Sequence, residues 1–206
     1  MELSYFGPKV MRKLFNRAAI KKSKMDPTAR ADIGAVVVES SMGRYSYIGE
    51  HTSLLSTDVG NFTSISNYCA IGGGGHPMEW VSMSPVFNSS KGILKKSFSQ
   101  NKYQPFARTT IGNDVWIGSH CLIRGGVSIS DGAVIGMGSV VTHDVGAYEI
   151  WAGNPARLIR KRFDADRIAK LMEIKWWEWE DERIERYAED FTSPDAFIKG
   201  WEDDSK

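Results

Sequence analysis

His76 is the residue best suited, by its type and its context, to move a proton. It follows four consecutive glycines, Gly72–Gly75, and it opens a segment in which regular patterns lapse. An imidazole has a pKa near neutrality, so it can take the proton of a hydroxyl that attacks a carbonyl group. We predict that His76 is a general base, with an ordinary corner histidine as the alternative. Glu79 is a candidate partner for its ring, although a solvated loop acid is the simpler interpretation.

A cluster of cations is the second chemical feature, and it comprises Arg157, Arg160, Lys161 and Arg162. The cluster stands out because the whole chain has a formal net charge of only +1. The planar guanidinium group binds two phosphate oxygens at once. The sequence therefore predicts a phosphate site in this cluster, with a solvated helical face as the alternative.

Metal and disulfide chemistry are not expected. His51, His120 and His143 lack the closely spaced pair that a histidine-bound zinc site would need. Only Cys69 and Cys121 are present, which is too few for a disulfide framework, and their spacing is not that of a CxxC motif. We predict that both cysteines are small buried side chains.

A six-residue repeat defines the elements that must position these residues. Branched apolar residues recur every six positions without a slip, at Ile111, Ile117, Ile123, Ile129, Ile135 and Val141. An α-helix would repeat near 3.6 and a half-buried strand at 2, so this period indicates short strands joined by tight corners. The fourth residue after each is small or branched, as the narrow interior of a triangular coil requires: Val115, Cys121, Val127, Ala133, Ser139 and Val145. Three six-residue sides make one coil, so Ile111 should stack on Ile129, Ile117 on Ile135, and Ile123 on Val141.

The repeat sets the domain boundaries. An earlier run places Val36, Met42, Ile48 and Leu54 six apart, and Val59, Ile65 and Ile71 follow after a one-residue slip. We expect a β-helix over 31–155 with a loop excursion over 77–110, which is too long for an ordinary turn. Residues 156–206 should form a helical appendage, with Asp164 and Asp166 at the start of a helix. The N-terminal segment 1–30 contains a candidate basic amphipathic helix over 9–24, which would dock on the body or contact a membrane.

Three stretches of the sequence resemble the hexapeptide-repeat acyltransferases, in particular the branch of xenobiotic and saccharide O-acetyltransferases. They are GGGGHPMEWVSMSPVF, IGNDVWIGSHCLIRGGVSISDGAVIGMGSVVTHDV and AGNPARLIRKRF, and the resemblance covers roughly residues 30 to 180. The combination of a loop histidine, an NDVWIG coil and a GNPA exit is specific to this branch. Met137 and His143 depart from the pattern, because the family more often has a small residue and a lysine there.

The resemblance implies an all-β left-handed parallel β-helix that assembles as a homotrimer and uses acetyl-CoA as its cosubstrate. His76 would then lie between subunits, beside the thioester. We expect acceptor specificity to reside in residues 80–106, with Trp80 as a candidate contact to the acceptor. Matching positions assign coenzyme A contacts to Trp116, Ser119, Met137, Thr142, Arg157 and Arg160.

The expected function is the transfer of an acetyl group from acetyl-CoA to a hydroxyl of a saccharide or similar small molecule. The alternatives are an O-acetyltransferase acting on a chloramphenicol-type or streptogramin-type drug, an amino-sugar N-acetyltransferase, and a non-enzymatic β-helical scaffold. The near-neutral charge gives no reason to expect a nucleic-acid partner. The opening residues lack the apolar region of a secretory signal, and no stretch approaches the ~20 apolar residues of a membrane span. A cytoplasmic location is therefore expected.

Overall fold

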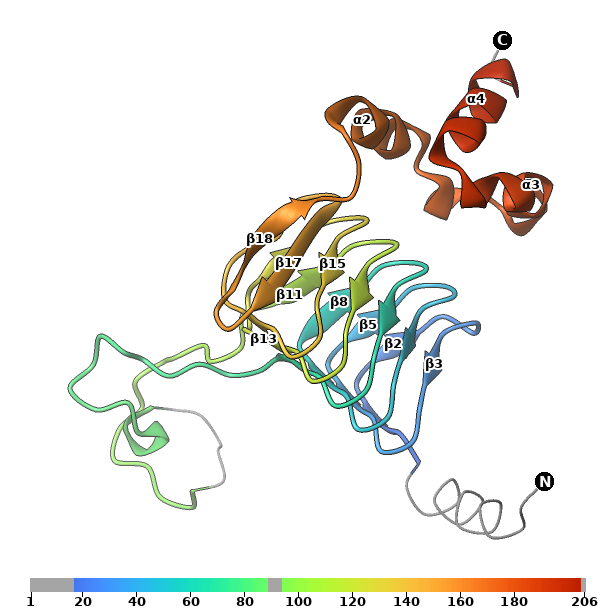
Figure 1. The fold of residues 1–206 in the computed structure, drawn as a ribbon. Helices are drawn as coiled ribbons and strands as arrows, with labels where there is room; N and C mark the ends of the chain where they lie inside the picture. The colour runs from blue at the N-terminus through green and yellow to red at the C-terminus, as the bar shows by residue number, and fades with distance from the viewer. Residues whose placement is uncertain (1–16, 89–93, 205–206) are drawn as a thin grey trace, which may run out of the picture.

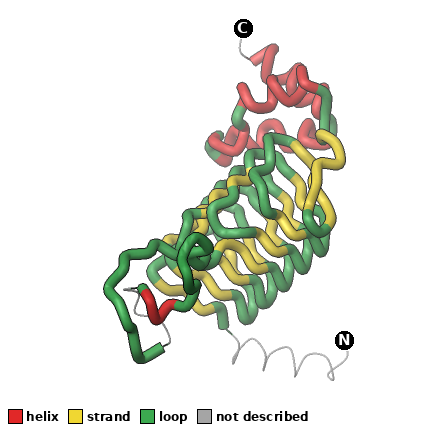
Figure 2. The backbone as a smooth tube through the Cα atoms, turned by 90° about the vertical axis from the view of Figure 1, so that its left-hand side faces the viewer, coloured by secondary structure: helices red, strands yellow, loops and turns green. Residues whose placement is uncertain are grey.

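Short parallel strands stack in three sheets that enclose one hydrophobic core (Figure 1). The structure is a computed structural model that describes residues 17–88 and 94–204. We call the three sheets A, B and C. The chain passes repeatedly from sheet A to sheet B to sheet C, so successive coils rise along one axis (Figure 2). The predicted parallel β-helix with a loop excursion and C-terminal helices is confirmed.

The strands of each sheet are as follows, in sequence order. Sheet A contains β1 (Ala19–Lys21), β4 (Val36–Val38), β7 (Ser53–Leu55), β10 (Ala70–Gly72), β13 (Leu122–Ile123) and β16 (Val140–Val141). Sheet B contains β2 (Lys24–Met25), β5 (Ser41–Met42), β8 (Thr57–Val59), β11 (Thr109–Ile111) and β14 (Ser128–Ile129). Sheet C contains β3 (Arg30–Ala31), β6 (Tyr47–Ile48), β9 (Ser64–Ile65), β12 (Trp116–Ile117), β15 (Val134–Ile135), β17 (Glu149–Gly153) and β18 (Ala156–Lys161).

The register of the C-terminal coils confirms the predicted ladder. Ile111 pairs with Ile129, and Ile117 pairs with Ile135. The six residues at the fourth positions, from Val115 to Val145, are also buried. The hexapeptide period therefore corresponds to side chains stacked along the inside of the prism, one coil above another.

The prediction is wrong by one residue at Val36, because Val37 is the side chain that points inward in β4. Val37 pairs with Leu54, and Met42 pairs with Val59, so each N-terminal coil has 17 residues rather than 18. The missing residue belongs to the side that runs from sheet A to sheet B. A left-handed residue forms this corner, such as Ser56 at φ 53°, as at the other corners of the coil, such as His51 at φ 56°. The slip read in the sequence thus recurs in every N-terminal coil.

The long excursion leaves the body after β10 and returns to it at β11. Its stem is held by a bridge between Gly74 and Phe106 and by a 2.6 Å hydrogen bond from the Gly75 amide to the Pro105 carbonyl. Beyond the stem the chain extends away from the prism and includes the short 3₁₀ helix η1 (Pro85–Phe87) (Figure 1). At the return, Arg108 pairs with the Asp58 carboxylate of β8.

The C-terminal segment begins with a hairpin rather than a helix. Strand β17 continues sheet C parallel to β15, and β18 pairs with β17 in the antiparallel direction at the edge of the sheet. The helices start at Ala165, where the Asp164 side chain accepts a 2.9 Å hydrogen bond from the Arg167 amide, as predicted for a cap. They are α2 (Ala165–Ile174), η2 (Trp176–Glu178), α3 (Asp181–Tyr187), η3 (Ala188–Thr192) and α4 (Pro194–Asp204).

This helical appendage has its own core and docks on the β-helix along the edge between sheets B and C. The core gathers aromatic side chains such as Trp177 and Phe197 around the buried Tyr148 of the body. Arg44 forms a 3.0 Å ion pair with Asp181 and donates a hydrogen bond to the Trp177 carbonyl. The appendage therefore contacts the first coils as well as the last.

The first half of the N-terminal helix predicted over 9–24, residues 9–16, lies outside the described residues. The described part of it forms β1 and β2 and is not helical. Within residues 17–88 and 94–204, no helix has the length and apolar character needed to cross a membrane.

Candidate active site

His76 lies just beyond the stem of the excursion, and its side chain is exposed. Its Nδ1 atom is 2.8 Å from the Met83 carbonyl oxygen. Because a carbonyl can only accept, Nδ1 must carry the proton of this hydrogen bond. In the neutral ring, Nε2 is then the unprotonated nitrogen and can accept a proton. The backbone of Met83, rather than Glu79, thus orients the ring.

An open groove of about 700 Å³ lies along the same excursion. Trp80, predicted to contact the acceptor, forms part of its wall and meets the ring of Tyr103 edge to face at 5.9 Å between centroids. The other lining residues are Glu79, Val81, Ser82, Phe87, Asn101 and Lys102. This part of the sequence has no repeat and no motif, so the residues that line the groove could not be predicted from it.

Two of the predicted coenzyme A contacts lie at the edge where sheet C turns into sheet A. Ser119 and Met137 are stacked there one coil apart, and the Gly138 amide donates a 2.8 Å hydrogen bond to the Ser119 carbonyl. Stacking is tight, since a Cβ atom on Gly118 would lie 2.6 Å from the Met137 amide nitrogen. Trp116 lies on the outer surface of β12, where half of its side chain is exposed. Trp116 and Met137 are exposed and Ser119 is half-buried, so this part of the surface is accessible.

Thr142 lies at a different edge, where sheet A turns into sheet B. Its hydroxyl is 2.9 Å from Nδ1 of His143. The excursion that carries His76 leaves the prism at this same edge, after β10. One chain therefore places His76 and Thr142 along one edge, and Ser119 and Met137 along another. The outer face of sheet A separates the two edges.

The cation cluster divides into two groups. Arg157 and Arg160 lie on β18 and are exposed, and each donates a 2.9 Å hydrogen bond to a backbone carbonyl. Neither forms an ion pair with any residue of the described ranges. Arg162 is different, because it forms a 3.0 Å ion pair with the half-buried Asp114 and a 2.9 Å hydrogen bond to the Gly132 carbonyl. Arg162 therefore joins the appendage to the body, whereas Arg157 and Arg160 have free guanidinium edges.

Packing against neighbouring residues accounts for two other histidines and for both cysteines. His51 and His120 stack on the two faces of Tyr68, at 5.4 Å and 5.1 Å between centroids. Cys69 and Cys121 are buried inside the coil, as predicted. In the part of the chain that the structure describes, no three His, Cys, Asp or Glu side chains form a group that could hold a metal ion.

Comparison with known proteins identifies the family of this chain. Residues 108–143 match the family of bacterial transferase hexapeptide (six repeats). The chain is 39% identical over 185 residues to a chloramphenicol acetyltransferase of Agrobacterium fabrum, an alignment that covers 80% of this chain and 88% of that protein. The chain belongs to the hexapeptide-repeat acetyltransferases. It is an acetyltransferase built on a left-handed parallel β-helix.

Two further comparisons extend this result. A galactoside O-acetyltransferase of Escherichia coli is 53% identical over 58 residues, which cover 28% of this chain and 29% of that protein. The fold also resembles that of AntD, an N-acyltransferase from Bacillus cereus solved with dTDP and 3-hydroxybutyryl-CoA. That likeness has a TM-score of 0.57 at 21% identity and covers 76% of this chain and 81% of that one.

Proposed function

We propose that this acetyltransferase uses acetyl-CoA to acetylate a hydroxyl group, with His76 as the general base. The observation that carries the proposal is the hydrogen bond from Nδ1 of His76 to the Met83 carbonyl. It leaves Nε2 as a proton acceptor on an exposed ring, and the same excursion carries a groove that can hold an acceptor. The acetyltransferase family supplies the reaction class.

In the proposed reaction, Nε2 of His76 takes the proton of the acceptor hydroxyl while its oxygen attacks the carbonyl carbon of the thioester. The carbon–sulfur bond then breaks, and the sulfur of coenzyme A leaves and receives the proton from His76. The products are an acetyl ester and free coenzyme A. A ternary complex with direct attack needs no acyl-enzyme, and Cys69 and Cys121 are buried away from the surface. Backbone amides would stabilise the oxyanion.

Coenzyme A would lie along the edge formed by Ser119 and Met137, with Trp116 beside it. Met137 and Gly138 are exposed at that edge, where the amide-containing pantetheine arm would run. Arg157 and Arg160 would bind the phosphates, because their guanidinium groups are exposed and free of carboxylate partners in the described chain. Thr142, at the other edge of sheet A, would contact the coenzyme from a neighbouring chain.

A homotrimer would bring these separated parts together. The outer face of sheet A is largely apolar, with Leu122 49% exposed and Val38, Leu55 and Val140 half-buried. Such a face favours contact with a second copy of the chain, and cyclic symmetry closes three copies into a ring. The excursion begins at one border of this face and extends outward, so it can reach a neighbour. His76 of one chain would then meet the coenzyme A edge, formed by Ser119 and Met137, of the next.

The acceptor we favour is a chloramphenicol-type hydroxyl compound rather than the saccharide preferred from the sequence. The chloramphenicol acetyltransferase of Agrobacterium fabrum matches over most of both chains. The groove also offers apolar walls at Trp80, Val81 and Phe87, which suit an aromatic acceptor. A saccharide is the second candidate, because the match to the galactoside O-acetyltransferase is 53% identical, although short.

The test is a panel of acceptors with acetyl-CoA, following the release of free thiol. Chloramphenicol, a galactoside and an amino sugar would be compared with a sample that lacks an acceptor. We expect chloramphenicol to stimulate thiol release and to appear as its acetyl ester by mass spectrometry. Stimulation only by the galactoside or amino sugar would exclude the favoured acceptor. Absence of acetyl transfer to any hydroxyl compound would contradict the proposed function.

A further inference from the structure

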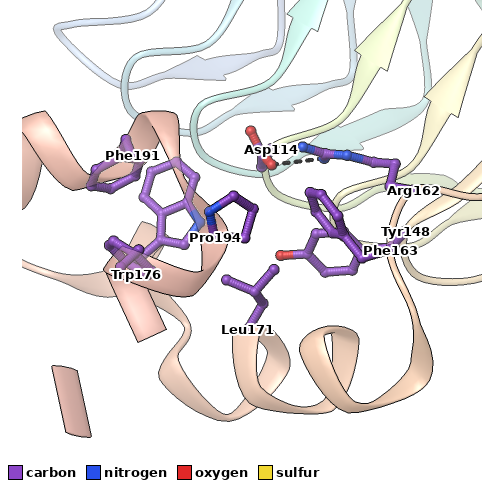
Figure 3. A pocket seen from close by; sticks show the side chains of 9 residues that line it. Asp114, Tyr148, Arg162, Phe163, Leu171, Trp176, Phe191 and Pro194 are labelled. Carbon is purple, nitrogen blue, oxygen red and sulfur yellow. Dashed lines mark hydrogen bonds and ion pairs between the residues drawn. The ribbon is translucent and has the colours of Figure 1, made fainter. Parts of the chain in front are cut away.

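A second pocket lies between the last coils of the β-helix and the helical appendage (Figure 3). The excursion leaves the body on another side, away from the appendage (Figure 1). It has a volume of about 200 Å³. Apolar and aromatic side chains form most of its wall, and Asp114, Tyr148 and Arg162 contribute polar groups. An apolar cavity of about 150 Å³ can hold a benzene molecule, so this pocket has room for one aromatic ring with a small substituent. The apolar lining residues are Phe163, Leu171, Trp176, Phe191, Pro194 and Phe197.

Tyr148 provides a polar group directed into this pocket. The side chain is 1% exposed, and its hydroxyl has no hydrogen-bond partner among the described residues. Figure 3 shows the phenolic oxygen pointing to the middle of the pocket, between Leu171 and Pro194. An unpaired buried hydroxyl is destabilising, so a phenylalanine would fill the same space at lower cost. The hydroxyl is therefore better explained by a molecule that enters the pocket than by packing alone.

The charges at the pocket determine what kind of molecule fits. Asp114 and Arg162 form a 3.0 Å ion pair, and Arg162 also donates to the Gly132 carbonyl, so neither charge needs a counterion from a ligand. Burial, together with the nearby Asp114 carboxylate, raises the pKa of Tyr148. The phenol therefore stays neutral and can donate a hydrogen bond.

We propose that this pocket binds a small uncharged aromatic molecule with one hydrogen-bond acceptor, which receives the Tyr148 hydroxyl proton. The aromatic ring would pack among Phe163, Leu171 and Trp176. Because α2 and η3 contribute to the wall, a bound molecule would also strengthen the docking of the appendage on the β-helix. This site does not depend on acetyl transfer.

Binding of two matched probes tests the proposal. Acetophenone carries a ring and a carbonyl acceptor, whereas ethylbenzene has nearly the same shape without an acceptor. Ligand-observed NMR titrations of the full chain should show acetophenone binding about three- to tenfold more tightly than ethylbenzene, the effect of one hydrogen bond. Tyr148→Phe should abolish this preference while the protein stays folded. Tyr68→Phe, at an exposed tyrosine on a distant edge, is the matched control and should keep it.

A pocket-filling variant separates this site from other apolar surfaces. Leu171→Trp should abolish binding of both probes, and circular dichroism would establish that it folds. Equal affinities of acetophenone and ethylbenzene for the wild-type protein would overturn the proposal. So would a preference that survives in Tyr148→Phe. A lack of acetophenone binding up to its solubility limit, with an ordered water on the Tyr148 oxygen in a crystal structure, would also overturn it.

Discussion

The proposed chemistry at the residue scale depends on how the His76 ring is held. His76 is exposed, so packing does not orient it, and its hydrogen bond to the Met83 carbonyl is what defines the ring nitrogen that can accept a proton. The sequence could predict His76, because histidine is rare in this chain and this one follows a glycine run. It could not predict Met83, because a backbone carbonyl carries no residue-type signal.

Removal of the imidazole tests this role. We expect His76→Ala to lower kcat by about 10²-fold to 10⁴-fold, as the loss of a general base typically does. The fold should be unchanged, because the side chain is exposed. His51→Ala is the matched control, since that histidine is also exposed but lies on an N-terminal coil. Steady-state kinetics of thiol release would measure both variants, and wild-type turnover in folded His76→Ala would contradict the assignment.

Arg157 and Arg160 should affect binding rather than chemistry. Their proposed contacts are with phosphates, far from the reacting carbonyl, and persist unchanged in the transition state. Arg157→Ala and Arg160→Ala should therefore raise KM for acetyl-CoA while kcat stays close to that of the wild type. Arg186→Ala, at another exposed arginine, should leave both constants unchanged. A fall in kcat alone would contradict the phosphate-binding role.

At the scale of elements, inward side chains of the coils hold the prism together. Ile135 is fully buried and pairs with Ile117 in the coil below. We expect Ile135→Ala to lower the free energy of unfolding by about 2–5 kcal/mol, because it removes buried methyl groups and leaves a cavity. Ile159→Ala, at a residue that is 62% exposed on β18, should change it by less than ~0.5 kcal/mol. Urea unfolding would compare them, and equal effects would contradict the ladder.

The ion pair between Arg108 and Asp58, where the excursion rejoins the β-helix, should make the free energy of unfolding depend on pH. The hydrogen bonds from Arg108 lower the pKa of Asp58 below its ordinary value. This pair therefore stabilises the protein above the unfolded pKa of aspartate, about 3.9, and the stabilisation is lost as pH falls toward the folded pKa. Both side chains are more than 40% exposed, so the effect should stay below ~1 kcal/mol.

Asp58→Asn measures this contribution. Its stability deficit relative to the wild type should be present at pH 6 and should shrink as the pH is lowered below about 4. Urea unfolding across this pH range would follow the difference. Glu185→Gln, at an exposed acid on α3, should show no comparable change. A deficit that is the same at every pH would contradict the ion-pair explanation.

The sequence predicted elements best where one strict period covers several coils. The ladder from Ile111 to Val141 was predictable because every position repeats the same inward environment. Val36 was misassigned because one side of a 17-residue coil is one residue shorter. Val36 lies six residues before Met42 and fits the count, although Val37 is the valine that points inward and pairs with Leu54. Strand β18 was expected to be helical, because a charged edge strand that pairs on only one side has no clear alternation.

At the scale of the whole molecule, we predict an oligomer, because His76 and the coenzyme A edge with Ser119 and Met137 lie on opposite sides of sheet A. We expect light scattering at assay concentrations to give three times the 23.0 kDa mass of the chain. Leu122→Lys would place a charge on the apolar face of sheet A and should shift the assembly toward monomer with loss of activity. Ser128→Lys, on the outer face of sheet B, is the matched control and should stay trimeric. A fully active monomer would contradict the assembly.

The most direct test of the account is whether two defective chains can restore one active site. His76→Ala would be co-refolded in equal amounts with a variant of the coenzyme A edge, Trp116→Ala combined with Ser119→Trp, after each alone is found inactive. If His76 acts on coenzyme A bound to a neighbouring chain, about one quarter of the sites should receive both intact parts, and activity should recover toward that fraction of wild type. If His76 and the coenzyme A edge of one active site belong to the same chain, the mixture should stay as inactive as its two parents.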